Sequence, residues 1–148
     1  LPILPFFPTA NSQLLTSGYY IDIPKIHALA PIIENVDPWN KKDYQEALKK
    51  GIAKAKGFNN YYFAHSSLPP WEMTRTNTAF LRLGQLTTGD EILIVKDGVK
   101  TKYTVTEKLE VWPGDIKVVQ NQNSGIILQT CSPPGTAFKR LLVFAKSS

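Results

Sequence analysis

The sequence contains very little sulfur and few imidazole groups. Its 148 residues include one cysteine, Cys131, and two histidines, His27 and His65. A single cysteine excludes an internal disulfide, so the cysteine content says nothing about whether the protein is secreted. There is no zinc-finger spacing and no aromatic motif of the RNA-binding kind, and we therefore expect no nucleic-acid partner.

Long apolar runs are absent as well. No stretch approaches the roughly 18 apolar residues that a membrane-spanning helix needs, and the sequence holds no internal repeat or low-complexity tract. The sequence begins at Leu1 without a methionine. We therefore expect an upstream signal or membrane anchor that is missing from it, and any membrane attachment would be made by that segment.

What is present is the composition of an ordinary globular protein, with 43% hydrophobic and 20% charged residues. This length suits one domain with a real core. The net charge of +5 favours acidic partners such as lipid headgroups or anionic wall polymers, without choosing among them. The lysines are scattered along the chain, as on a solvated helix face.

Two segments depart from the β-patterns that dominate the chain. Prolines and aromatic residues without any period predict an extended arm over residues 1–17, packed on the rest of the protein. Residues 40–57 predict a helix, with Asn40 as the N-cap, apolar residues at helical spacing as far as Ile52, and Gly57 at the end.

The other periodic runs predict short strands separated by turn signals. The strongest hairpin signal is Asp97-Gly98. With the helix at 40–57 and one or two helical turns at 79–86, the pattern predicts a mainly β protein, either a barrel or a sandwich of seven or eight strands. The expected strands are residues 18–26, 29–36, 60–65, 91–96, 99–111, 125–131 and 140–145.

The sole cysteine has two interpretations. A lone cysteine on a strand is most often a small buried hydrophobic residue. Cys131, however, ends its apolar run, a loop follows it at residues 133–135, and Arg140 opens the next strand. If these two strands pair, the guanidinium can stabilise a thiolate and a developing oxyanion. Both interpretations remain open on these residues alone.

A nucleophilic thiol also needs a group that carries protons. His27 lies between two strands and is expected to be a surface residue in a turn. His65 ends an aromatic run just before a long polar loop, which is a suitable position for a general acid or base.

Several segments resemble the sortases, a family of bacterial cysteine transpeptidases. "GIAKAKGFNNYYFAHSS" is similar to the region around the family's catalytic histidine, and "FLRLGQLTTGDEILIV" to the turn and strand that follow. "ILQTC" resembles the family's TLxTC signature, and "CSPPGTAFKRLLV" its loop from cysteine to arginine and its last strand. "YYIDIPKI" is similar to the opening strand. The resemblance covers about Gly18 to Ala145, in the family's order.

This resemblance implies a sortase-type eight-stranded β-barrel with one or two short helices, with a catalytic domain at 18–148 after the arm. It implies that Cys131 is the nucleophile, that His65 protonates the leaving amine and deprotonates the incoming one, and that Arg140 steadies the oxyanion. No metal takes part in this chemistry. Some family members use calcium to order a loop, but the sequence shows no acidic cluster that would bind it, so we expect no cofactor.

The resemblance also implies the substrates. The family cuts an LPxTG-like sorting signal, commonly between threonine and glycine, and transfers the acyl fragment from a thioester to an amine of peptidoglycan or pilin. We expect substrate contacts at Ala64, Ser66, Trp71 and Thr130, although a loop anchor for Trp71 and an ordinary strand residue for Thr130 are alternatives. The enzyme would be monomeric and extracytoplasmic, anchored at the cell membrane.

Two further tryptophans have structural interpretations. Trp112 precedes a proline turn and is expected in the core. Asp37-Pro38-Trp39 is similar to the lid motif of pilin-building sortases, but its position after the first strands favours a turn at the entry of the helix.

Two other classes compete with the sortase hypothesis. One is a non-enzymatic, basic β-barrel binding module in which Cys131 is buried and inert. The other is an L,D-transpeptidase, but that family places glycine and histidine before the cysteine, where this chain has Gln129-Thr130. Alkylation of the native thiol separates the first alternative from an enzyme.

Overall fold

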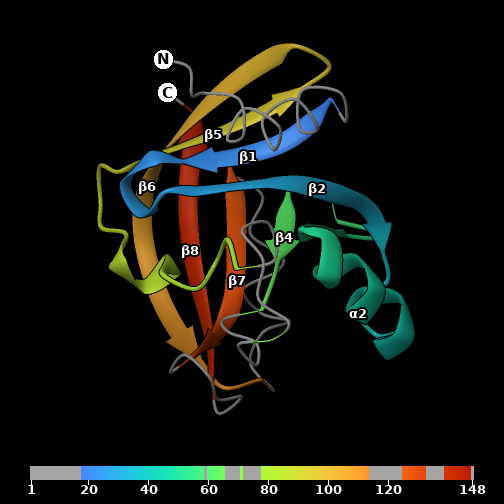
Figure 1. Cartoon of the computed structure of the whole chain (residues 1–148). Helices are drawn as coiled ribbons and strands as arrows, with labels where there is room; N and C mark the ends of the chain where they lie inside the picture. Colours follow the sequence, from blue (N-terminus) through green and yellow to red (C-terminus); the bar gives the residue numbers. More distant parts are fainter. Residues whose placement is uncertain are drawn as a thin grey trace.

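Eight strands close into a barrel with the order β1-β2-β3-β4-β7-β8-β6-β5 (Figure 1). The computed structural model describes residues 18–58, 60–65, 71, 78–113, 125–132 and 139–147. The predicted arm at 1–17 lies outside the described residues. The strands are β1 (Tyr19–Ile23), β2 (Ala28–Val36), β3 (Ile52–Ala55), β4 (Tyr61–Phe63), β5 (Glu91–Lys96), β6 (Val99–Val111), β7 (Ile126–Ser132) and β8 (Lys139–Ser147). The helical elements are η1 (Pro24–Ile26), α2 (Lys41–Lys50) and η3 (Leu83–Gln85).

The strand pairing confirms the mainly β barrel. β2 pairs with β3, and β4 with β7, in parallel, whereas the other neighbouring strands are antiparallel. The predicted hairpin turn is confirmed, because Asp97 and Gly98 connect β5 to β6 with φ values of 51° and 83°. Two successive positive φ values are typical of the turn that matches the twist of a hairpin.

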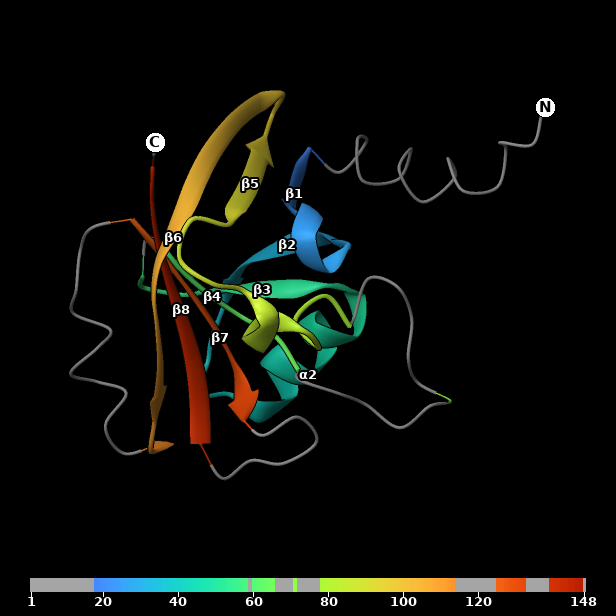
Figure 2. The ribbon, with the colours of Figure 1, turned by 90° about the vertical axis from the view of Figure 1, so that its left-hand side faces the viewer.

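The core fills the barrel and is extended by the segment before β5. Ile21 and Leu128 are fully buried strand residues. Phe80, Leu83 and Leu86 are also fully buried, although they lie in and around η3 rather than in a strand. Each such side chain contributes about 1.5–3 kcal/mol by leaving water. Figure 2 shows η1, η3 and α2 together on one side of strands β6, β7 and β8.

The helix α2 begins as predicted. The Asn40 side chain accepts a hydrogen bond from the backbone N–H of Asp43 at 3.1 Å. The residues before it form a turn, in which the Asp37 carboxylate accepts from the backbone N–H of Trp39 at 2.9 Å. The interpretation of residues 37–39 as a helix-entry turn agrees with these bonds. Trp39 is exposed there.

The predicted end of this helix is wrong. α2 ends at Lys50 rather than Gly57, and Ile52 lies in strand β3 instead of the helix. Gly51 makes the change of direction, and a Cβ at this position would lie 2.3 Å from the Pro31 carbonyl oxygen. Ile52 is fully buried because β3 inserts between β2 and β4. The burial of a central strand outweighs the weak helix preference of this segment.

The first predicted strand is too long. β1 ends at Ile23, and residues 24–26 form the short helix η1, because Pro24 starts its first turn. His27 follows η1 and is exposed, with a left-handed backbone at φ 53°. The prediction of a surface turn histidine is confirmed.

Trp112 was predicted in the core and is 58% exposed, so that prediction is wrong. Val111, paired with Arg140, is the last residue of β6. Trp112 lies beyond this last pair, and among the described residues no neighbouring strand pairs with it. Its ring instead packs against the Lys139 ammonium group, which lies 4.9 Å from the ring centre.

Within the described part of the chain, no helix has the length and apolar character required to cross a membrane.

Candidate active site

Strands β7 and β8 bring the cysteine and the arginine together. Their antiparallel register pairs Cys131 directly with Arg140. Directly paired residues of antiparallel strands have Cα atoms about 4.5–5.5 Å apart and lie on the same face of the sheet. Two positions separated by a loop in the sequence are therefore neighbours in the barrel.

Strand β4 runs beside β7 and ends two residues before His65. Its parallel register with β7 pairs Tyr61 with Ile127 and Phe63 with Gln129. The alignment continues beyond the strand, because the backbone N–H of Ala64 donates to the Gln129 carbonyl at 3.2 Å. Continued two residues past the end of β4 at Phe63, the same offset (127 − 61 = 131 − 65) would align His65 with Cys131.

A buried hydroxyl strengthens this alignment. Thr130 is 3% exposed, and its Oγ1 donates to the Ala64 carbonyl at 3.1 Å. This bond joins the residue before His65 to the residue before Cys131. It is therefore placed to fix the spacing of β4 and β7 beside the candidate site.

We expect Thr130→Val to destabilise the protein by about 1–3 kcal/mol, because valine keeps the shape but leaves the buried Ala64 carbonyl without this donor. Urea unfolding measures the difference. Thr106→Val is the matched control, because the Thr106 hydroxyl also donates to a carbonyl, that of Phe144 at 3.3 Å, but Thr106 is exposed. Equal losses in the two variants would contradict a special role for the Thr130 bond.

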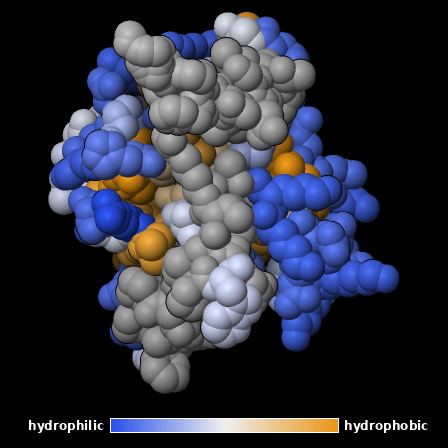
Figure 3. Space-filling view, viewed as in Figure 1, coloured by the Kyte–Doolittle hydropathy of each residue, from blue (hydrophilic) through white to orange (hydrophobic). Residues whose placement is uncertain are grey.

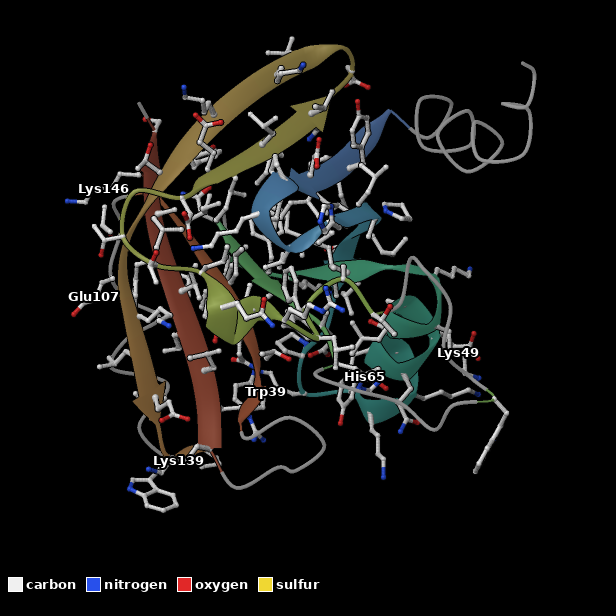
Figure 4. The ribbon with its side chains drawn as sticks, turned by 60° about the vertical axis from the view of Figure 1, so that its left-hand side comes forward. Trp39, Lys49, His65, Glu107, Lys139 and Lys146 are labelled. Carbon is white, nitrogen blue, oxygen red and sulfur yellow. The ribbon has the colours of Figure 1, made fainter. Side chains whose placement is uncertain are left out.

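Aromatic packing holds β4 in place. The Phe63 ring meets the Tyr44 ring of α2 edge-on, with centroids 6.3 Å apart, and the Tyr61 ring lies 5.9 Å from that of Phe58. The Tyr61 hydroxyl also hydrogen-bonds the Gln129 side chain. His65 thus follows a strand that is anchored both to α2 and to β7. Figure 4 shows His65 beside α2.

The arginine occupies the start of β8. Arg140 is half-buried, and its guanidinium donates to the Lys139 carbonyl at 3.4 Å. Figure 4 shows Lys139 and His65 in the same lower part of the molecule. His65 is half-buried as well, so neither group is sealed in the core.

The predicted substrate contacts have different surroundings. Ala64 and Thr130 are buried, and their hydrogen-bonding groups join β4 to β7. Trp71 is 83% exposed. Ser66 lies outside the described residues. A substrate contact at each of these positions stays a prediction.

Three residues that contribute to this arrangement were not predicted to do so. Gln129 and Tyr61 join the two strands through their side chains, and Tyr44 supports Phe63 from the helix. The sequence carried a weak signal for them, because Tyr61 and Gln129 each lie in the runs that contain the candidate residues. Their pairing depends on the strand register, which no local pattern reveals.

The interior of the barrel also holds titratable groups away from this site. The hydroxyls of Tyr19 and Tyr62 lie 3.2 Å apart and are buried. Burial raises the pKa of both phenols above the ordinary value. The two groups are therefore neutral at physiological pH and form a satisfied polar contact inside the core.

No group of three or more histidine, cysteine, aspartate or glutamate side chains that could hold a metal ion occurs among residues that the structure describes.

Comparisons with known proteins agree on one family. The family model for the sortase domain matches residues 21–148. Sortase D of Bacillus subtilis (strain 168) is 28% identical over 131 residues, which cover 85% of this chain and 61% of that protein. The chain therefore spans less than two thirds of the length of this relative.

Solved structures give the same result. Sortase A from Corynebacterium diphtheriae is 27% identical with a TM-score of 0.71, over 88% of this chain and 60% of that chain. Sortase C1 of Streptococcus agalactiae is 25% identical with a TM-score of 0.72, over 88% and 66% of the two chains. The predicted sortase-type barrel is confirmed.

Proposed function

This chain belongs to the sortase family, and on that premise we propose that it is a cysteine transpeptidase that uses Cys131, His65 and Arg140. The observation that supports the proposal is the strand register: Cys131 pairs with Arg140 across β7 and β8, and β4, which ends two residues before His65, runs parallel to β7 on its other side. A core cysteine of a binding module requires neither a histidine nor an arginine beside it.

The proposed reaction has two stages. The Cys131 thiolate attacks the carbonyl carbon of the scissile peptide bond, and the carbonyl oxygen becomes an oxyanion. Collapse of this adduct expels the amine, which takes a proton from the His65 imidazolium and leaves a thioester. An incoming amine then attacks the thioester, passes its proton to His65 and restores the thiolate.

Arg140 is proposed to bind the oxyanion. A guanidinium is always charged and offers donors in a planar fork, so it can hold a carbonyl oxygen as negative charge develops on it. The direct pairing of Arg140 with Cys131 supports this role, since the oxyanion forms on the carbon that becomes bonded to the sulfur.

We expect Arg140→Lys to lower kcat/KM by about a hundredfold, because a point charge cannot reproduce the fork. Steady-state cleavage of a sorting-signal peptide measures the loss. Lys139→Arg is the matched control, since it makes the reverse exchange one residue away and should leave the rate near that of the unmodified protein. A near-full rate in Arg140→Lys would show that the oxyanion role is wrong.

The proposed substrate is an LPxTG-like sorting signal, cut between threonine and glycine, and the acceptor is an amine of peptidoglycan or pilin. We propose that Ala64, Ser66, Trp71 and Thr130 border the peptide. The exposed indole of Trp71 is available for such a contact, and Ala64 and Thr130 would act mainly by holding the neighbouring catalytic residues.

The proposed setting follows from the family. We propose an extracytoplasmic enzyme that is attached to the cell membrane through a segment outside residues 1–148 and works as a monomer. The catalytic domain would be residues 18–148, preceded by the arm at 1–17.

A trapping experiment tests the function. The protein is incubated with a library of LPxTG variants without an acceptor amine, and intact-mass spectrometry detects the thioacyl adduct. We expect a mass increase equal to the acyl fragment, on the peptide that contains Cys131, and its loss when an amine is added. If no library member forms an adduct and the native thiol resists alkylation, the inert-thiol binding module is the better interpretation.

A further inference from the structure

A pocket of about 240 Å³ lies between η1 and the segment that leads into η3. None of its lining residues belongs to the candidate active site. Isoleucine, alanine and leucine side chains form its apolar lining, and His27, Thr78 and Arg82 supply its polar groups. Figure 3 shows apolar surface between strongly hydrophilic side chains on the left of the molecule, over this region.

The described lining of the pocket carries positive charge without a matching carboxylate. Among the residues that the structure describes, no aspartate or glutamate lines the pocket, and neither His27 nor Arg82 makes an ion pair. The guanidinium of Arg82 is charged at any physiological pH. His27 and Arg82, two side chains that can bind anions, thus line one pocket, and no described residue supplies a negative charge to balance them.

Asp90, in the turn before β5, is already paired. The Asp90 carboxylate lies 2.9 Å from the Lys25 ammonium group of η1 and accepts the Thr87 backbone N–H at 2.7 Å. The Thr87 bond and then the Lys25 bond hold the pKa of Asp90 below its ordinary value, so this carboxylate stays charged and paired at neutral pH. Asp90 therefore neutralises Lys25 rather than the pocket.

The backbone at the rim of the pocket is unusual. His27 has φ 53° and ψ 35°, and its N–H donates to the Pro24 carbonyl at 3.1 Å. A left-handed backbone costs a residue with a Cβ some free energy, and such conformations gather at ligand sites. Histidine is among the residues that adopt this conformation most readily after glycine, and here it places His27 at the rim of the pocket.

We propose that this pocket binds a small oxyanion, a carboxylate or a phosphate, that carries a short apolar group. Arg82 would hold two of its oxygens with its planar fork, and His27 and Thr78 would offer further hydrogen bonds. At roughly 30 Å³ for each water, the volume has room for about eight waters, which suits a group of this size. The apolar lining suits a methyl or methylene group beside the charge.

Nuclear magnetic resonance of the labelled full chain tests the proposal with two probes that carry short apolar groups, N-acetylalanine and ethyl phosphate. We expect saturable shifts of the backbone signals of residues 26–28 and 78–82 at millimolar concentration. N-acetylalaninamide, which has no carboxylate, should leave them unchanged. The probe that binds more tightly identifies whether a carboxylate or a phosphate is the preferred group.

Variants separate a built site from general attraction to a basic protein. Arg82→Gln should weaken binding at least about tenfold, because it removes a charge-assisted bond. His27→Asn, which tolerates the left-handed backbone, should weaken it by a smaller factor. Lys100→Gln removes the same charge from the exposed β5–β6 hairpin and should leave the affinity unchanged.

Three outcomes would overturn the proposal: no saturable shift with either probe, shifts that map elsewhere, or equal weakening by Arg82→Gln and Lys100→Gln. The experiment needs no turnover of a sorting signal. Its failure is therefore distinct from a failure of the proposed transpeptidase function.

Discussion

Cys131→Ala is expected to abolish peptide cleavage and transfer, with a loss of at least about a thousandfold in kcat. The methyl group of alanine cannot form the thioester on which both stages depend. The fold should persist, because Cys131 is close to the end of β7 and its backbone pairing with Arg140 does not need the sulfur. Cleavage of an LPxTG-like peptide and the thioacyl adduct are the two readouts.

His65→Ala is the companion variant, and it should reduce turnover almost as far while leaving the thiol in place. The two variants together distinguish a catalytic pair from an inert cysteine. An inert thiol would leave cleavage at the level of the unmodified protein in both variants. Circular dichroism and a thermal melt of each variant control for unfolding.

Gly125→Ala is expected to destabilise the fold by about 2–4 kcal/mol. Gly125 directly precedes β7 and has φ +83°, which is unfavourable for a residue with a Cβ. A Cβ there would also lie 1.9 Å from the Ala145 carbonyl oxygen, so β8 would have to move. Because β7 and β8 carry Cys131 and Arg140, this displacement would reach the candidate site.

Gly98→Ala is the matched control for that variant. Gly98 has the same φ of +83°, but nothing lies within 4 Å of its Cβ position. Gly98→Ala should therefore destabilise the protein only by the backbone cost of the positive φ, about 1 kcal/mol. Urea unfolding of the two variants then isolates the cost of the clash with β8, and equal losses would show that the strands absorb the methyl group freely.

The strands were predictable because their signals are local, whereas these signals left a barrel and a sandwich open and only the family resemblance favoured the barrel. Asp97-Gly98 marks a hairpin by its turn chemistry alone, and the structure has that turn. β3 was missed because residues 51–57 alternate small and charged residues in a way that suits a helix or a strand. Pairing with the neighbouring strands β2 and β4 makes this segment a strand, and that pairing is a tertiary contact that no local pattern shows.

Trp112 shows a second limit. Hydrophobicity predicted a buried side chain, yet burial depends on whether a neighbouring strand extends far enough to cover it. β8 pairs with β6 as far as Val111 at this end, so Trp112 is left outside the barrel. A residue's type gives its preference, and the register determines whether that preference is met.

The candidate residues were singled out by their positions at strand ends, and the resemblance then implied their roles. Nothing local in the sequence says that His65 and Cys131 lie at one level, because the relation passes through a parallel pair of strands. The arginine was easier, since a strand, a short loop and a second strand suggest an antiparallel pair. The structure supplies what the motifs could not, which is the Thr130 bond to the Ala64 carbonyl.

The parallel pairing of β4 with β7 also bears on how the protein folds. Residues 64–125 separate the two strands along the chain, and this stretch includes both strands of the β5–β6 hairpin. A contact of such long range requires closure of a large loop, which raises the contact order and slows folding. The β5–β6 hairpin can form early, whereas β4 gains its partner β7 only late in folding. A nascent chain therefore cannot align residues 61–63 with residues 127–129 until β7 has been synthesised.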